Sequence, residues 1–238
     1  MGDEINEKDI SNLEYFIIPG IDVESSAKAR DFSFEYPSKS YWSAGLHPHE
    51  ADGLEEIKQE LLSLMQEADL IGETGLDYYR NLSSKENQIK NFEFHINVAE
   101  ELNKPLIIHC RDSFSDVFDI LSKKDSNNPI ILHSWTGGNK WTKRFAELGV
   151  YFSISGIVTY DTAHDLQAAV TKVPRDKLLL ETDVPYLAPQ PFKGKRNNPT
   201  YIKYTGAKVA ELLNLTPREL SNITITNTNN VLNRESNE

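Results

Sequence analysis

Four stretches of the sequence end a strand-like apolar run with a residue that can bind a metal ion through nitrogen or oxygen. They are LIGETGLDYYR (70–80), PLIIHCRD (105–112), PIILHSW (129–135) and LLLETDVPYLAP (178–189). The candidate ligands are Glu73, His109, His133 and Asp183. Imidazole nitrogens suit Zn, Mn, Fe or Co. A lone histidine or carboxylate at a strand end is more often a core or solvated group. The repetition over four segments is what predicts a metal-dependent hydrolase.

Seven strand-like runs alternate with helical patterns along the chain, and each run is short, β-branched and apolar on both faces, as buried parallel strands are. They cover residues 15–21, 41–47, 70–76, 105–110, 129–134, 150–156 and 177–183. In a parallel barrel the carboxyl ends of the strands share one rim, where catalytic groups converge. We therefore predict an α/β fold of the TIM-type (β/α) barrel class, as a single domain over residues 1–238. Residues 1–13 are polar and helical in pattern, so this barrel lacks its first strand.

Helical patterns separate the strand-like runs. One stripe at i, i+3, i+4, i+7 spacing lies in residues 114–121, and similar stripes lie in 89–99 and 54–64. Thr216 and Pro217 form a suitable N-cap and first-turn pair for a last helix.

Composition excludes some classes of protein. The 238 residues carry 25 Lys and Arg against 36 Asp and Glu, a formal net charge of -11. Proteins that coat duplex DNA through their whole surface are usually basic, so any phosphate contact here must be local or made through a metal. The only cysteine, Cys110, rules out an internal disulfide and fits a reducing compartment. The acidic N-terminus resembles no targeting peptide, and no apolar run approaches the ~18 residues of a membrane span. We expect a cytoplasmic protein without membrane association.

Two histidines after the second strand-like run are further candidates. His47 and His49 stand at i and i+2 in LHPH, and on an extended segment they would face the same way. They could form a metal pair, or belong to a polar loop that contacts substrate.

Basic residues near the strand ends are candidate phosphate contacts. Arg80 and Arg111 lie just beyond two of the candidate ligands and could hold a phosphate by paired hydrogen bonds, or form surface ion pairs. Lys195 and Arg196, with Lys193, follow the last strand-like run, at a place where barrels often bind phosphate. A solvated loop is the alternative for this basic cluster.

Six blocks of the sequence resemble, in order and spacing, the TatD family of metal-dependent deoxyribonucleases within the amidohydrolase superfamily. The blocks are IIPGIDVESS (17–26), AGLHPHEA (44–51), IGETGLDYYR (71–80), PLIIHCRD (105–112), LLLETDVPYLAP (178–189) and KRNNPTYI (195–202). The resemblance covers nearly the whole chain, from about Phe16 to Leu232. It implies a cytosolic barrel hydrolase that cleaves DNA phosphodiesters, including 3′-to-5′ exonuclease action on single strands.

The resemblance also implies roles for particular residues. Glu73 matches the family's bridging glutamate, His109 and His133 its two later histidine ligands, and Asp183 its last aspartate. His47 and His49 match histidines of the active-site surroundings, which makes them candidate substrate contacts rather than main ligands. Two departures are small: HSWTGG (133–138) replaces an HCFSG-like run, and Asn198 stands where many relatives have Glu.

One departure is larger, because the family begins with a strand that carries a His-x-His pair, and this chain has no histidine before His47. Without the pair, one metal site would keep Glu73 and Asp183, and the other Glu73, His109 and His133. Three explanations compete: a shortened or mis-started version of a full enzyme, a divergent member that works with one metal, and a binding-only relative.

The sequence therefore predicts a hydrolase that uses one or two divalent ions (Mg, Mn or Zn) to cleave single-stranded DNA. The ion would polarise the phosphate and activate water, and Asp183, with Glu73, would serve in catalysis. Two alternatives stay open. The same residues could hydrolyse a small amide or ester, or the chain could bind nucleic acid or protein without catalysis.

Overall fold

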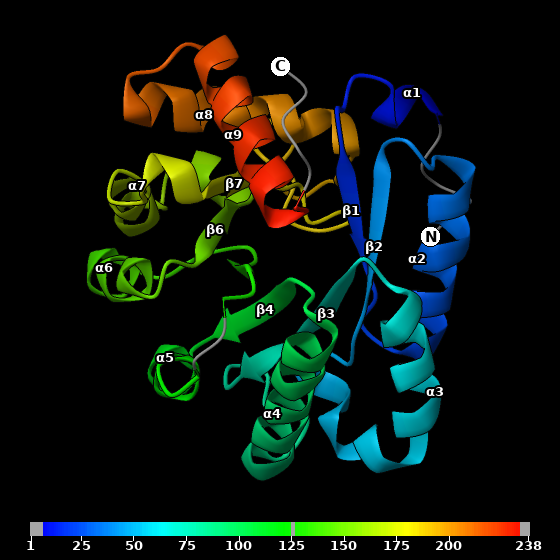
Figure 1. The fold of residues 1–238 in the computed structure, drawn as a ribbon. Helices are drawn as coiled ribbons and strands as arrows, with labels where there is room; N and C mark the ends of the chain where they lie inside the picture. Colours follow the sequence, from blue (N-terminus) through cyan, green and yellow to red (C-terminus); the bar gives the residue numbers. More distant parts are fainter. Residues whose placement is uncertain (1–6, 125–126, 234–238) are drawn as a thin grey trace. The chain divides into compact units, whose positions relative to one another are not determined.

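The computed structural model describes residues 7–124 and 127–233. Strands and helices alternate along the chain (Figure 1), and the pairing of the strands follows their sequence order, β1 to β7. The chain divides into two compact units. Of the described residues, unit 1 contains 13–124 and 127–131, and unit 2 contains 7–12 and 132–233. The prediction of a single domain stays a prediction.

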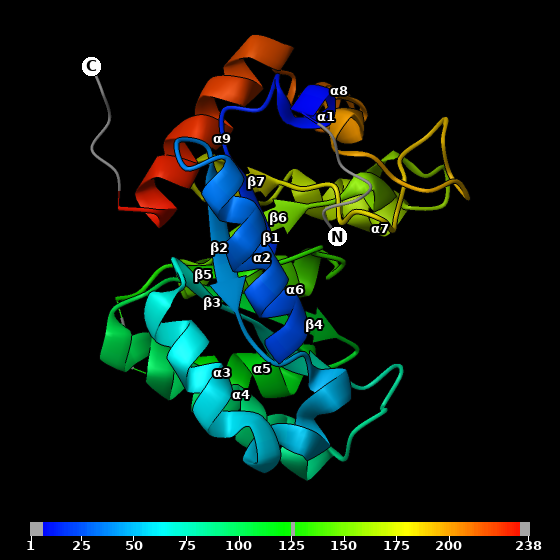
Figure 2. The same ribbon diagram turned by 90° about the vertical axis from the view of Figure 1, so that its right-hand side faces the viewer.

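Unit 1 contains four strands that pair in parallel, each with its sequence neighbour. They are β1 (Phe16–Pro19), β2 (Ser40–Ala44), β3 (Leu70–Asp77) and β4 (Leu106–Arg111), and β5 (Ile130–Leu132) lies at the boundary with unit 2. The helices of this unit are α2 (Val23–Glu35), η1 (Pro48–Gly53), α3 (Leu54–Glu67), α4 (Lys85–Leu102) and α5 (Phe114–Leu121). Helix α2 packs on β2, α4 packs on β3, and α2 and α3 lie side by side (Figures 1 and 2). The three predicted helical stripes fall within α3, α4 and α5.

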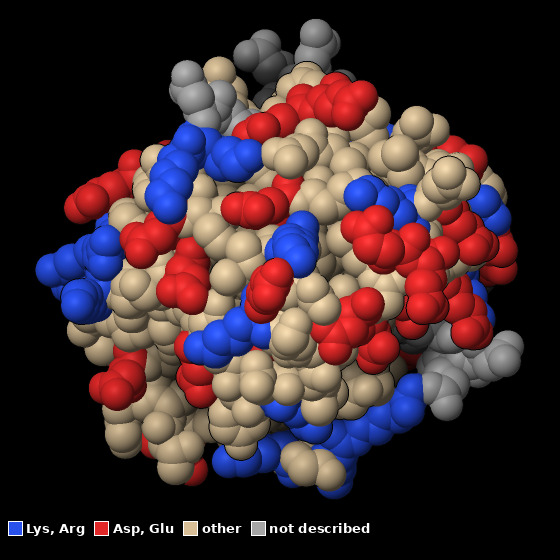
Figure 3. All heavy atoms as spheres, turned by 90° about the horizontal axis from the view of Figure 1, so that it is seen from below, with Lys and Arg blue, Asp and Glu red and all other residues tan. Residues whose placement is uncertain are grey.

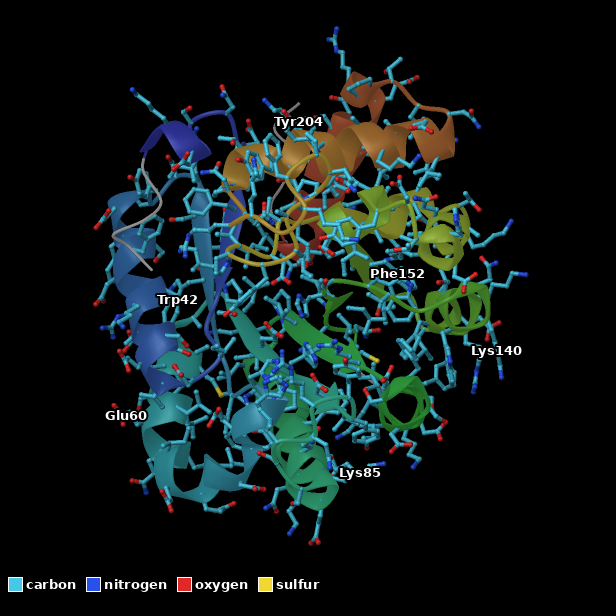
Figure 4. All side chains as sticks on the ribbon, turned by 180° about the vertical axis from the view of Figure 1, so that it is seen from behind. Trp42, Glu60, Lys85, Lys140, Phe152 and Tyr204 are labelled. Atoms are coloured by element: carbon cyan, nitrogen blue, oxygen red, sulfur yellow. The ribbon has the colours of Figure 1, made fainter. Side chains whose placement is uncertain are left out.

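Most residues of β2, β3 and β4 are buried, which explains why their sequences are apolar rather than alternating, whereas the four residues of β1 are half-buried. Every residue of β3 is buried. Trp42 on β2 is also buried (Figure 4), as are Phe92 on α4 and Ile108 on β4. These side chains form the core that fixes the carboxyl ends of β3 and β4.

Unit 2 contains β6 (Tyr151–Ile154) and β7 (Leu178–Leu180), which pair in parallel. Its helices are α1 (Glu7–Ile10), α6 (Asn139–Glu147), η2 (Gly156–Thr159), α7 (His164–Val170), η3 (Arg175–Lys177), η4 (Pro199–Tyr201), α8 (Ile202–Leu213) and α9 (Pro217–Val231). Helices α8 and α9 pack on β7. The predicted start of the last helix is confirmed, because Thr216 caps α9 and exchanges hydrogen bonds with Glu219 in a capping box.

All seven predicted strands are present, and the α/β fold class is confirmed. In the described part of the chain no helix is both long and apolar enough to cross a membrane. Acidic and basic side chains are interspersed over much of the face drawn in Figure 3.

Candidate metal centre

Glu73 lies in a bulged part of β3. The pairing register between β3 and β4 shifts between Ile71 and Thr74, and the two glycines that flank Glu73 have positive φ, 119° at Gly72 and 128° at Gly75. Residues with a Cβ rarely adopt this backbone conformation, and a Cβ at Gly75 would collide with the carbonyl oxygen of His109. The glycines therefore allow the bulge that sets the direction of the Glu73 side chain.

Glu73 lies beside two imidazole rings in unit 1. Its Oε1 atom is 3.2 Å from Nδ1 of His109 at the carboxyl end of β4, and 3.4 Å from Nε2 of His47 after β2. One ligand-type atom from each of the three residues lies within 4.8 Å of the others. The carboxylate of Glu73 is only 9% exposed. Two nitrogens and a carboxylate in this arrangement have the composition of a divalent-metal site.

The ring of His47 is held in one tautomer. Its Nδ1 accepts a hydrogen bond of 3.2 Å from the backbone N–H of His49. Burial lowers the pKa of His47 despite the opposing charge of Glu73, so the ring is neutral near pH 7 and its proton lies on Nε2. In this arrangement His47 is a hydrogen-bond donor that orients Glu73.

His109 has the opposite arrangement. Its Nε2 lies 3.0 Å from Oδ2 of Asp77, which is also 3.0 Å from Nε2 of His49. A proton on Nε2 of His109 leaves the lone pair of Nδ1 directed toward Glu73. A carboxylate behind a histidine in this way fixes the ring and raises the basicity of the free nitrogen, as in many metal sites.

Asp77, the last residue of β3, is fully buried and held from both sides. The backbone N–H of Arg80 donates to its Oδ1, and its own N–H donates to Gln88. Burial alone would raise the pKa of Asp77, but the hydrogen bonds from His109, Arg80 and His49 hold it well below its ordinary value. Asp77 is thus an anion that supports the imidazoles.

A second group of metal-ligand type lies in unit 2. Nδ1 of His133, the residue after β5, is 3.2 Å from Oε1 of Glu181, the residue after β7. Ligand-type atoms of His133, Glu181 and Asp183 lie within 4.8 Å of one another. Asp183 has a φ of 58°, a left-handed conformation that Asp and Asn adopt more readily than most residues.

Two buried side chains fix the segments that carry this second group. Trp135, 1% exposed, packs against Phe145 and Phe152 and donates to Thr142 through its indole nitrogen. It follows His133 by two residues and anchors that segment. The side-chain amide of Asn197 donates to the carbonyl oxygens on both sides of Asp183, those of Thr182 and Tyr186. These two hydrogen bonds brace the loop around Asp183.

The sequence prediction grouped four ligands around one cation. The structure brings Glu73 and His109 together in unit 1, and His133 and Asp183 together in unit 2. Each group is described within its own unit, and the prediction that all four share an ion stays a prediction. The segment after His47 is not extended, because η1 begins at Pro48. His47 therefore faces Glu73 while His49 faces Asp77.

Three residues of these groups were not predicted as site residues. Glu181 could have been found from its i, i+2 spacing to Asp183 in Glu-Thr-Asp. Asp77 and Asn197 carried no such signal, because their partners lie far away in the sequence. Two predicted phosphate contacts, Arg80 and Arg111, lie in unit 1, three residues after Asp77 and two residues after His109. The predicted contacts Lys195 and Arg196 lie on the exposed loop after β7 in unit 2.

Imidazole and carboxylate groups that gather within and just after the strands of an alternating β/α fold are typical of metal-dependent hydrolases. Comparisons with known proteins agree. A family model described as "TatD related DNase" matches residues 2–233. The "uncharacterized metal-dependent hydrolase YabD" of Bacillus subtilis is 36% identical over 222 residues, which is 90% of this chain and 86% of that protein. The corresponding YcfH protein of Escherichia coli K12 is 38% identical over 189 residues, 78% and 71% of the two chains.

Solved structures give the same result. The crystal structure of YJJV, a TatD homologue from E. coli K12, matches with a TM-score of 0.90 and 25% identity over 98% of this chain and 93% of that one. A TatD family hydrolase from Entamoeba histolytica has the same fold, with a TM-score of 0.84. The chain belongs to the TatD-related family of metal-dependent hydrolases.

Proposed function

We propose that this protein is a deoxyribonuclease that hydrolyses phosphodiester bonds of single-stranded DNA with the help of a divalent ion. The observation that carries the proposal is the presence of two imidazole–carboxylate groups, one around Glu73 and one around Asp183, in a chain of the TatD-related DNase family. Their donor atoms are nitrogen and oxygen, which fit Mn or Zn, and Mg through the carboxylates.

The proposed ligands are Glu73, His109, His133 and Asp183. A divalent ion bound by these residues would supply a Lewis acid for the phosphate oxygens and would make water a stronger nucleophile at neutral pH. One or two ions would serve, since each group offers both a carboxylate and an imidazole.

The protein's own side chains supply the acid–base and positioning steps. Asp183 orients the attacking water and accepts its proton, as a carboxylate general base does. His47 holds the carboxylate of Glu73 through its Nε2–H, and Asp77 holds the ring of His109. The geometry of the ligands is thus set by hydrogen bonds before substrate arrives.

Basic side chains would neutralise the phosphates of the bound strand. Arg80 and Arg111 stand on the loop after β3 and at the end of β4, close in sequence to Asp77 and His109. Lys195 and Arg196 are exposed on the loop that Asn197 connects to Asp183. A guanidinium can donate two parallel hydrogen bonds to one phosphate.

The proposal is tested by stripping the protein of metal, restoring Mg, Mn or Zn, and assaying a labelled single-stranded oligonucleotide beside its duplex and a panel of simple carboxyl esters and amides. We expect metal-dependent cleavage of the single strand. The substitution D183N should reduce kcat by at least about a hundredfold while leaving the fold intact. The matched control is D161N, at an exposed aspartate of the same unit, which should retain full activity.

Turnover of an ester or amide without cleavage of DNA would contradict the proposal and show that the protein is a metal-dependent hydrolase of small esters or amides. Equal cleavage by wild type and D183N would remove Asp183 from the reaction.

A further inference from the structure

Tyr79 is a large aromatic side chain that unit 1 leaves exposed to solvent. It lies in the loop after β3, two residues beyond Asp77, and is 62% exposed. The guanidinium of Arg111 lies over its ring, 3.9 Å from the centroid. Burying an exposed aromatic ring is favourable, and this one keeps most of its surface in water.

The Tyr79–Arg111 pair is connected rigidly to the proposed metal ligands. Arg111 follows His109 by two residues at the end of β4, and its carbonyl oxygen accepts a hydrogen bond of 2.9 Å from the N–H of Tyr78. Asp77 accepts from the backbone of Arg80 and from the ring of His109. The backbone on both sides of Tyr79 is therefore held by hydrogen bonds to Asp77 and Arg111, and Asp77 also contacts the ring of His109.

The neighbouring Tyr78 contacts two helices of unit 1, in contrast to the exposed Tyr79. The hydroxyl of Tyr78 donates to Asp116 on α5 over 2.7 Å, and the Lys85 ammonium lies over its ring. Tyr78 thus connects β3 to α4 and α5. The Tyr79 side chain makes no hydrogen bond with the described residues, and its ring contacts the guanidinium of Arg111.

The chemistry of the pair fits one nucleotide. The guanidinium covers one face of the ring and leaves its N–H groups, which lie in its own plane, able to donate to a phosphate. No hydrogen bond or ion pair of the Arg111 side chain occurs within the described chain. The other face of Tyr79 offers a flat apolar surface, on which any base can stack.

We propose that Tyr79 and Arg111 form a nucleotide subsite, in which the tyrosine ring stacks on an unpaired base and the arginine binds the phosphate next to it. This inference rests on the proposed function, which it deepens by giving a physical reason for single-strand preference. A base within a duplex has both faces covered by its neighbours and cannot stack on a side chain without leaving the helix. The subsite accepts all four bases, since stacking does not read their edges.

The experiment measures binding apart from cleavage. Fluorescence anisotropy gives the Kd of a single-stranded phosphorothioate oligonucleotide, which resists hydrolysis, for the Mn-loaded protein. We expect Y79A to bind about tenfold more weakly and Y79F to bind as the wild type does. F34A is the matched control, because Phe34 on α2 is an equally exposed aromatic residue of the same unit. Its Kd should not change.

A second oligonucleotide identifies the contact. Removing the bases, to leave an abasic strand, should weaken binding to wild type about tenfold but weaken binding to Y79A no further. An equal loss in both proteins overturns the subsite, as does an unchanged Kd in Y79A. If wild type cleaves single strands while Y79A behaves as wild type does, the subsite fails and the proposed function stands. If wild type neither binds nor cleaves single-stranded DNA, both fail.

Discussion

Oδ2 of Asp77 lies 3.0 Å from Nε2 of His109, on the opposite side of the ring from Glu73. The imidazole is therefore placed between two carboxylates, one buried behind it and one in the candidate metal group. A proton held on Nε2 by Asp77 leaves Nδ1 as the nitrogen that can bind an ion beside Glu73.

The substitution D77N tests this relationship. An amide in place of the carboxylate removes the negative charge that favours a proton on Nε2 of His109. We expect Mn or Zn affinity to fall about 10- to 100-fold, measured by calorimetric titration of the metal-stripped protein. The control is D119N, at an exposed aspartate on α5 of the same unit. Unchanged affinity in D77N would show that the carboxylate does not control the ring.

The role of His47 is separable from that of His109. If His47 is a donor to Glu73 and not a ligand, H47Q retains a donor group and should keep its metal affinity within about threefold of wild type. H109Q removes a ligand nitrogen and should lose far more. The same titration measures both proteins, and an equal loss in the two would make His47 a ligand.

The bulge in β3 depends on Gly75. Alanine at this position would face the carbonyl oxygen of His109 and would need a φ of 128°. We expect G75A to lower the free energy of unfolding by about 3 kcal/mol. G53A is the control, because a Cβ at Gly53 meets nothing within 4 Å and its φ is negative. Denaturant unfolding measures both, and similar stabilities would show that β3 tolerates a side chain there.

His95 predicts how stability depends on pH. This fully buried ring donates from Nδ1 to the carbonyl of Asn91 and accepts at Nε2 from the N–H of Leu46. Burial lowers its pKa from 6.5 to about 4. The stability that depends on the neutral ring is fully present above pH 6.5 and is lost as pH falls toward 4. This is because the unfolded chain takes up a proton that the folded chain excludes.

The expected loss is about 3 kcal/mol between pH 6.5 and pH 4. H95Q keeps an acceptor for Leu46 but cannot take up the proton. The difference in unfolding free energy between wild type and H95Q should therefore change over this pH range. Parallel pH profiles for the two proteins would contradict the assignment.

Asn197 tests whether the loop around Asp183 must be braced. N197L removes the amide that donates to the carbonyls of Thr182 and Tyr186, at a position only 3% exposed. We expect a loss of about 3 kcal/mol in stability and reduced metal affinity, because two acceptors lose their partner. N222A, at an exposed asparagine on α9, is the control. Full metal affinity in N197L would show that the loop holds Asp183 without it.

The sequence was informative wherever a signal was local. Short apolar runs predicted every strand, and His133 directly follows one of them, but Glu73 lies inside β3 rather than at its end, because the strand continues to Asp77. The supporting residues could not be predicted in this way. Asp77 contacts a histidine 32 positions away, and Asn197 reaches back 15 positions to Thr182. Such contacts depend on which strands and loops become neighbours, and on the tautomer that each ring adopts.

The left-handed backbone at residue 183 limits which residue types can stand there. Only glycine, asparagine and aspartate occupy such a conformation at little cost. A relative that had lost hydrolysis but kept this backbone conformation would still favour one of these three residue types at position 183. If Asp183 is catalytic, as proposed, asparagine would be the residue expected here in a relative that keeps the fold and has lost hydrolysis.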